Sequence, residues 1–203
     1  MKIINLTEDS EVYTSNVYLV TGTWNALSDQ NTLIDVGRDP LIFEKIQNAR
    51  TGVGKRKLDQ VILTHSHYDH AMLTPEIREL FSPRIYAFSN SLKYIDIILK
   101  GDEIIRIGDR EFEVIHTPGH THDSICLYCE EDGVLFAGDT PVIIRVPGST
   151  YDEAFLEAML YIATKDVREI YFGHGRPMLE NCNVAIRNSI MNMKKSRVVS
   201  IHL

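Results

Sequence analysis

A six-residue segment in the middle of the chain, His65-Ser66-His67-Tyr68-Asp69-His70, places three imidazoles and a carboxylate in one short turn. The preceding run, 58–64, is short, apolar and rich in branched side chains, which predicts a buried strand. Thr74 and Pro75 then have the order of an N-cap and a first helical residue, with acidic side chains following. The segment is therefore expected on a loop between a strand and a helix, where rigid neighbours would hold metal-binding groups in place.

The composition is that of a globular chain. With 44% hydrophobic and 24% charged residues, 203 residues can bury a sizeable core. No Pro-, Gly- or Ser-rich linker divides the sequence, so we predict a single domain over residues 1–203.

A net charge of -7 without a long basic block argues against a nucleic-acid partner. No apolar run approaches the ~20 residues that cross a bilayer, and the first residues lack a signal peptide's layout, so we expect a cytoplasmic protein without a membrane partner.

Three cysteines, an odd number, fit a reducing compartment better than a disulfide framework. Cys126 and Cys129 have the spacing of a redox pair. They fall in a predicted strand, 124–129, where positions i and i+3 face opposite sides. Since no helix N-terminus is expected beside them to activate a thiol, we favour a structural role over a redox or metal-binding one.

Strands and helices alternate along the rest of the chain. Strands are expected at 11–21 and 33–37, a helix begins near Pro40, and a further strand and helix occupy 84–99, with Ser89 or Asn90 as the helix cap. From Asp102 the pattern becomes that of a strand meander, at 103–107, 110–116, 124–129 and 133–137. A Thr150-x-x-Glu153 capping box predicts a helix, followed by a strand at 169–172 and a helix from about 181 to 194. This mixture predicts a layered α/β fold with helices outside a central sheet.

Further candidate metal ligands follow other predicted strands. His120 comes after a sharp Pro-Gly turn, Asp139 ends a strand in Gly-Asp, and His174 lies between two glycines that would let backbone pass close to an ion. His116 precedes the Pro-Gly turn and is expected to be structural, and His202 is expected in a frayed terminus. Five imidazoles and two carboxylates would suffice for two metal ions. These candidates are His65, His67, Asp69, His70, His120, Asp139 and His174.

The ordered motifs His-x-His-x-Asp-His, Thr-Pro-Gly-His-Thr, Gly-Asp-Thr and Gly-His-Gly resemble the metallo-β-lactamase superfamily, and its short glyoxalase-II-like hydrolases in particular. The resemblance covers roughly residues 33–175. It implies a four-layer αββα sandwich with the metals at one edge of two facing sheets. It further implies that His65, His67 and His120 hold one metal, that Asp69, His70 and His174 hold the other, and that Asp139 bridges them. Asp35 would orient a ligand by hydrogen bonding.

Two such ions, zinc first and iron or manganese as alternatives, would turn a bridging water into a hydroxide nucleophile near neutral pH. We therefore expect a binuclear hydrolase of a small thioester, ester or lactone, with Asp69 as a catalytic carboxylate that orients the hydroxide. Tyr68 and His122 are candidate substrate contacts, although packing is favoured for Tyr68. Arg145, in the apolar run 141–149, is a candidate contact for a substrate anion or, equally, a solvated side chain.

Departures from the family pattern bear on the substrate. Ala71-Met72-Leu73 stands where many relatives have a glycine pair, and Thr121-His122-Asp123-Ser124 stands where glyoxalase-II-like members read Thr-x-Gly-Ser. The sequence also stops soon after the last ligand, without the C-terminal domain that binds glutathione in full-length glyoxalase II. A glutathione thioester is therefore not favoured.

Other functions compete with hydrolysis. An iron-dependent oxidoreductase would resemble the persulfide dioxygenases or the diiron core of flavodiiron proteins. Full ligand sets for both metals argue against the mononuclear dioxygenase, and the absence of a flavin domain argues against a self-sufficient flavodiiron enzyme. A non-enzymatic metal-dependent sensor is the third alternative, although it would not need seven ligand positions. The expected partner is a small-molecule substrate, and association into a homo-oligomer is left open.

Overall fold

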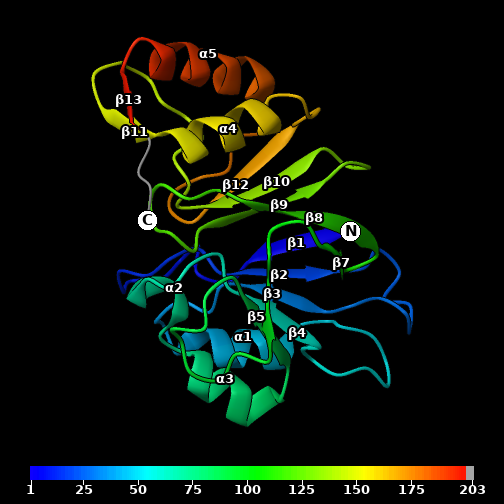
Figure 1. Ribbon diagram of the computed structural model, residues 1–203. Coiled ribbons are helices and arrows are strands. Elements are labelled where there is room, and N and C mark those ends of the chain that lie inside the picture. The colour runs from blue at the N-terminus through cyan, green and yellow to red at the C-terminus, as the bar shows by residue number, and fades with distance from the viewer. Residues whose placement is uncertain (200–203) are drawn as a thin grey trace.

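Two β-sheets face each other at the centre of the molecule in the computed structural model, which describes residues 1–199 (Figure 1). The first sheet has its strands in chain order; its first three strands pair antiparallel and the rest pair parallel. Those strands are β1 (Lys2–Asn5), β2 (Tyr18–Thr21), β3 (Thr32–Ile34), β4 (Gln60–Ile62), β5 (Arg84–Ala87) and β6 (Ile97–Ile98).

The second sheet has the order β12-β10-β9-β8-β7, and within it only β10 and β12 pair parallel. Its strands are β7 (Ile104–Ile107), β8 (Arg110–His116), β9 (Ile125–Cys129), β10 (Val134–Gly138) and β12 (Glu169–Phe172). A small parallel sheet pairs β11 (Thr150–Asp152) with β13 (Arg197–Val199).

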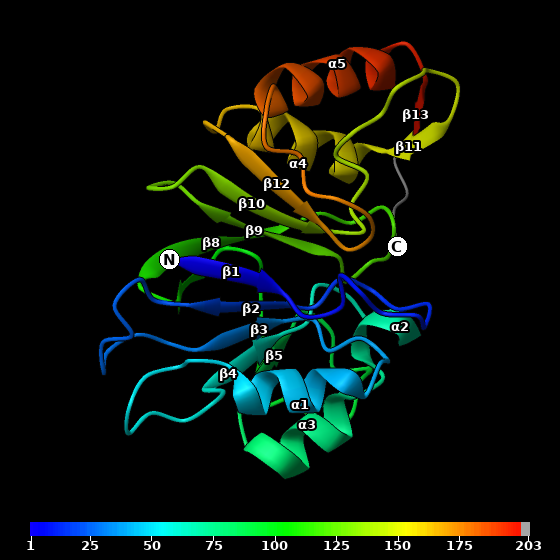
Figure 2. The same cartoon turned by 180° about the vertical axis from the view of Figure 1, so that it is seen from behind.

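Helices cover both outer faces of the paired sheets. In Figures 1 and 2, α1 (Leu41–Asn48) and α3 (Thr74–Phe81) lie against the first sheet, while α4 (Glu153–Ile162) and α5 (Cys182–Lys194) lie against the second. In both views the one-turn helix α2 (Tyr68–Ala71) and the small β11–β13 sheet lie toward the same edge of the sandwich. The arrangement is the predicted αββα sandwich.

Three apolar cores separate the four layers, and β9 contributes to two of them. Ile125, Leu127 and Cys129 face the core between the sheets, whereas Cys126 and Tyr128 face the core beneath α4 and α5. The two cysteines thus face opposite sides of the strand, as its alternation predicts. Both thiols are free and buried, and burial raises the pKa of Cys126 to about 11, which fits the structural role.

Most predicted elements are present, but the helix expected within 84–99 is wrong. The chain there forms a loop and then β6, because Asp96 ties it to β5: its backbone amide donates to the Ile85 carbonyl, and its carboxylate accepts from the Ile85 amide. Tyr94 has a left-handed φ of 70°, which would end a helix. Leu92 and Ile95, within this loop, still pack on the core beneath the first sheet.

Two boundaries also differ from the expectation. Only Tyr18–Thr21 of the strand expected at 11–21 is a strand, and the residues before it form a loop. Thr150 lies in β11, and the N-cap of α4 is instead Asp152, whose Oδ1 accepts from the Ala154 amide at 2.9 Å. Four further elements, β1, α2, β11 and β13, were not predicted, and all of them are short. His202 lies outside the described residues.

Among residues 1–199, no helix is long and apolar enough to cross a membrane.

Candidate metal centre

All seven predicted metal ligands lie at one edge of the sandwich, each just beyond a strand. Those of the first sheet follow β4, on the turn that includes α2; those of the second follow β8, β10 and β12. Their potential ligand atoms form two groups, within each of which all atoms lie within 4.8 Å of one another. The first group is His65, His67, His120 and Asp139, and the second is Asp69, His70 and His174.

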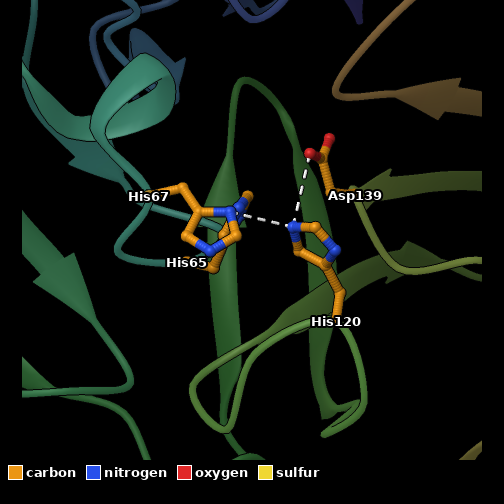
Figure 3. A group of neighbouring side chains, drawn as sticks. All are labelled: His65, His67, His120 and Asp139. Carbon is orange, nitrogen blue, oxygen red and sulfur yellow. Dashed lines mark hydrogen bonds and ion pairs between the residues drawn. The ribbon is translucent and has the colours of Figure 1, made fainter.

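The first group converges on a small space between the two sheets (Figure 3). His67 Nδ1 and His120 Nε2 lie 2.9 Å apart, and His120 Nε2 lies 3.5 Å from Asp139 Oδ2. His65 Nε2 is buried without a hydrogen-bond partner among residues 1–199. A buried nitrogen left unpaired beside two converging imidazoles and a carboxylate fits a bound divalent cation, which would supply the missing partner.

The second group shares a carboxylate with the first. His174 Nε2 lies 3.1 Å from Asp69 Oδ2 and 3.5 Å from Asp139 Oδ2, while Asp139 Oδ1 lies 3.3 Å from His70 Nε2. The geometry of that last contact is too poor for a hydrogen bond, so His70 Nε2 is also unpaired. Asp139 therefore contacts imidazoles of both groups, the position a bridging carboxylate would need.

Asp35 holds the turn that carries the first four donors. Its side chain is 2% exposed and its φ is 59°, a left-handed conformation that aspartate tolerates better than most residues. Oδ1 accepts from the Thr64 amide at 2.7 Å, and Oδ2 accepts from Thr64 Oγ1 at 2.9 Å and lies 2.8 Å from His70 Nδ1. A proton held on Nδ1 by this carboxylate leaves Nε2 free for a cation.

The charges at the site favour a cation. Burial lowers the pKa of His65 to about 4 and also lowers that of His120, so both imidazoles are neutral, the form that binds metals. Burial lowers the pKa of His70 too, but the Asp35 and Asp139 carboxylates outweigh it and raise the pKa to about 10. Burial raises the pKa of Asp139, yet contact with His70 and nearby imidazoles holds it at about 2, so the carboxylate is ionised. A cation would replace the extra proton of His70, which makes binding pH-dependent.

The profile of the Metallo-beta-lactamase superfamily matches residues 11–174. The chain belongs to this superfamily. Among curated relatives, an uncharacterized protein of Aquifex aeolicus is 34% identical over 132 residues, which are 55% of this chain and 60% of that protein. A protein of Rhodopseudomonas palustris named hydroxyacylglutathione hydrolase is 32% identical over 124 residues, 58% of this chain and 49% of that protein. The chain thus spans about half the length of these curated relatives.

Solved structures agree on the superfamily's fold. ETHE1 from Myxococcus xanthus has a TM-score of 0.68 at 20% identity, covering 95% of this chain and 88% of its own. Rubredoxin oxygen:oxidoreductase from Desulfovibrio gigas has a TM-score of 0.65 at 17% identity, covering 89% of this chain and 53% of its own. Identities this low establish the fold alone.

Gly173, beside His174, belongs to the tightest packing of this superfamily site. A Cβ at Gly173 would lie 2.1 Å from Asp139 Oδ1 and 2.7 Å from His70 Cε1. The sequence suggested that glycines here would let backbone approach an ion. Gly173 lies close to the side chains that would hold the ion, and its approach to the ion itself stays a prediction.

The loop before β2 packs against the site, and the sequence did not indicate it. Asn16 donates its backbone amide to the Gly173 carbonyl at 2.6 Å, and its Nδ2 to the carbonyls of Phe172 and Gly175 at 2.9 and 2.8 Å. Tyr13 stacks on His174 with ring centroids 5.4 Å apart. Asn16 therefore fixes the loop that carries His174.

The three candidate substrate contacts lie in different places. Tyr68 is 60% exposed, and the Arg38 guanidinium lies 5.5 Å from its ring centroid, so its packing contact is at the surface; a substrate contact stays a prediction. His122 lines a pocket that also includes His120 and Asp139. Arg145 lines a separate hollow with Arg176.

The run 141–149 that carries Arg145 is divided between the pocket and the core, since Pro141 lines the pocket of His120 and Asp139. Val142 and Ile144 are buried in the core beneath α4 and α5, so they offer no apolar surface to a substrate.

His116 has the structural role expected of it: its ring stacks on Phe88 at 3.9 Å, and its Nε2 lies 2.7 Å from the His122 carbonyl oxygen.

Proposed function

We propose that this chain is a binuclear metal-dependent hydrolase of a small thioester, ester or lactone. The observation that carries the proposal is the pair of donor groups joined by Asp139, with buried imidazole nitrogens unpaired in both. The name of the Rhodopseudomonas palustris relative supports thioester hydrolysis. Because the chain covers 49% of that relative, glutathione itself is not part of the proposal.

Each side chain has a defined task in this proposal. His65, His67 and His120 would hold one ion, and Asp69, His70 and His174 the other, with Asp139 between them. Such ions supply an activated water and polarise the bond under attack. Asp69 would also orient the attacking water through its second carboxylate oxygen, and Asp35 would keep the proton of His70 on Nδ1.

The test combines metal analysis with turnover. The protein would be prepared with zinc, manganese or iron as the sole supplied metal, and each form analysed for ions per chain and assayed on thioesters, esters and lactones. We expect close to two ions per chain, turnover that a chelator abolishes, and a loss of at least ~100-fold in His67→Ala and Asp139→Asn. Glu111→Gln, which changes an exposed carboxylate at the start of β8, the end of that strand opposite to His120, is the matched control. A fully loaded protein that hydrolyses none of these compounds would refute the proposal.

An iron-dependent oxidoreductase is the second candidate, because imidazole and carboxylate donors suit iron as well as zinc. It predicts oxygen uptake by the iron form, with a persulfide or an electron donor as co-substrate, and no hydrolysis by the zinc form. Measuring oxygen consumption beside the hydrolase assays separates the two functions.

A further inference from the structure

A pocket of about 510 Å³ opens directly onto the candidate metal centre. His120 and Asp139 form its inner end, and the turn at Pro118–Gly119, the start of α4 and the β11–β13 sheet form its walls. The volume suits one group of a small molecule. A substrate whose reacting bond lies at the metal centre would place one of its ends here.

Much of the wall is apolar. Pro141, Tyr151, Phe155 and Val199 line it, and the Tyr151 and Phe155 rings lie 6.2 Å apart. Gly119 brings the turn close to Phe155, since a Cβ there would lie 3.1 Å from the ring. These surfaces favour an alkyl or aryl group that leaves water on binding.

The charges that line the pocket are all negative or titratable. Apart from Asp139, the carboxylate among the described lining residues is that of Asp152, and no lysine or arginine lines the pocket within residues 1–199. Asp152 uses Oδ1 to cap α4, and it forms no ion pair with the described basic side chains. Arg145 and Arg176 line the separate hollow, and Arg197, which is exposed and pairs with Thr150 in the β11–β13 sheet, is not a lining residue of the pocket. The candidate metal ions would lie at the inner end, where the reacting bond is expected, whereas a carboxylate bound beside Asp152 would meet repulsion that no lining lysine or arginine compensates.

We propose that the substrate group that enters this pocket is uncharged and largely apolar, and that Asp152 selects against substrates whose group there carries a carboxylate. This inference rests on the proposed hydrolase function. It adds a substrate class, neutral acyl compounds, and a specificity-determining residue. It also separates this chain from hydrolases of strongly anionic thioesters.

The test compares matched thioesters that differ only in a remote charge. The hexanoyl thioester of N-acetylcysteamine is uncharged; its adipoyl counterpart carries a carboxylate on the acyl side, and the hexanoyl thioester of 3-mercaptopropionate carries one on the leaving-group side. We expect the neutral compound to exceed at least one charged compound about tenfold in kcat/KM at low salt. Added salt should narrow the difference, because screening weakens repulsion.

Asp152→Asn isolates the charge, since asparagine also caps helices well. It should reduce the neutral-to-charged ratio about fivefold for the compound against which the enzyme discriminates. Glu157→Gln removes a carboxylate from the exposed face of the same helix and should leave the ratio as it is. Equal turnover of all three thioesters, or a ratio that Asp152→Asn does not move, would overturn the inference.

Inert amides keep this test separate from the hydrolase proposal. Calorimetric binding of the amide analogues of the neutral and charged thioesters to the metal-loaded protein gives the same comparison without turnover. Absence of hydrolysis with preferential binding of the neutral amide would defeat the proposed function alone. Hydrolysis without charge discrimination would defeat the inference alone.

Discussion

The first sheet presents four of its donors on one turn after β4, whereas the second presents three donors on three separate loops. On the first side, Asp35 reaches the turn through Thr64 and His70. On the second side, His120, Asp139 and His174 are brought together only because their strands are neighbours or near neighbours in the folded sheet. One half of the centre is thus held by local contacts and the other by tertiary structure.

Contacts at the site edge join the two halves. The Ile125 amide donates to the Thr64 carbonyl at 2.9 Å, and the Asn16 amide donates to that of Gly173 at 2.6 Å. Gly138, with a φ of 51°, lies so close to Thr64 that a Cβ there would be 2.6 Å from Thr64 Oγ1. We call the donors from the second sheet, His120, Asp139 and His174, the dispersed half of the metal centre. Their positions depend on how the two sheets pack together. Substitutions can therefore test this half and the turn 65–70 separately.

The largest effect is expected from Gly173→Ala, which acts where the halves meet. The new methyl group would displace Asp139 and His70, so affinity for both ions should fall more than ~100-fold, as measured by metal titration. Gly175→Ala is the control: nothing lies within 4 Å of its Cβ, so it should cost only about 1 kcal/mol of stability from its left-handed φ of 81°. Equal metal binding by the two variants would contradict the packing argument.

Asp35→Asn probes the locally held half. It keeps the side-chain shape but removes the charge that fixes the His70 proton, and we expect metal affinity to fall about 10–100-fold. Asp59→Asn is the matched control, since Asp59 also accepts a backbone amide, that of Asn31 at 2.8 Å, yet lies before β4, whereas the donors of the first sheet follow β4. If Asp59→Asn weakens metal binding as much as Asp35→Asn does, the effect is one of general stability.

Asn16→Ala probes the dispersed half through its His174 loop. Loss of the Nδ2 bonds to Phe172 and Gly175 should lower the free energy of unfolding by about 1–3 kcal/mol and weaken one ion more than the other. Chemical denaturation and stepwise metal titration measure the two effects. Asn183→Ala, which removes a bond from Nδ2 to Asp166 away from the donors, should leave both ions bound as before.

The smallest effect concerns a buried hydroxyl pair in the second half. Thr117 Oγ1 and Thr140 Oγ1 lie 2.8 Å apart and connect the loops that carry His120 and Asp139. A double-mutant cycle with Thr117→Val and Thr140→Val should give a coupling of about 1 kcal/mol in denaturation experiments. Additive effects of the two substitutions would show that the loops are positioned independently.

The contrast between donors adjacent in the chain and donors on separate loops also explains which parts of the site could be predicted from the sequence. The metal-binding turn 65–70 could be predicted from the sequence because its donors are adjacent in the chain. The opposite facing of Cys126 and Cys129 could be predicted from strand alternation alone. The dispersed donors His120, Asp139 and His174 could be predicted from their places after expected strands, and the resemblance to the superfamily assigned them to two metals and gave Asp35 its role. Asn16 could not have been found this way, because its partner Phe172 lies 156 positions away and an asparagine in a loop carries no signal.

The errors have the same origin. Leu92 and Ile95 have helical spacing, but pairing of Asp96 with Ile85 at the edge of β5 decides the structure there. Arg145, for which a substrate contact and a solvated position were equal expectations, lines another hollow although it follows Asp139 closely in sequence, and Val142 and Ile144 between them are buried in the core. Proximity along the chain predicted proximity in space only where no buried segment intervened.

The opposite facing of Cys126 and Cys129 also affects whether the chain can refold after it has been unfolded. Folded, the strand keeps these thiols in different cores, so they cannot pair. Unfolded in the presence of an oxidant, two cysteines separated by two residues can join, and the resulting link would prevent β9 from regaining its alternation. Heating the protein in air should therefore lower the fraction that refolds on cooling, and a reductant should prevent this loss. The redox state of the solution, and not temperature alone, then determines whether the chain refolds.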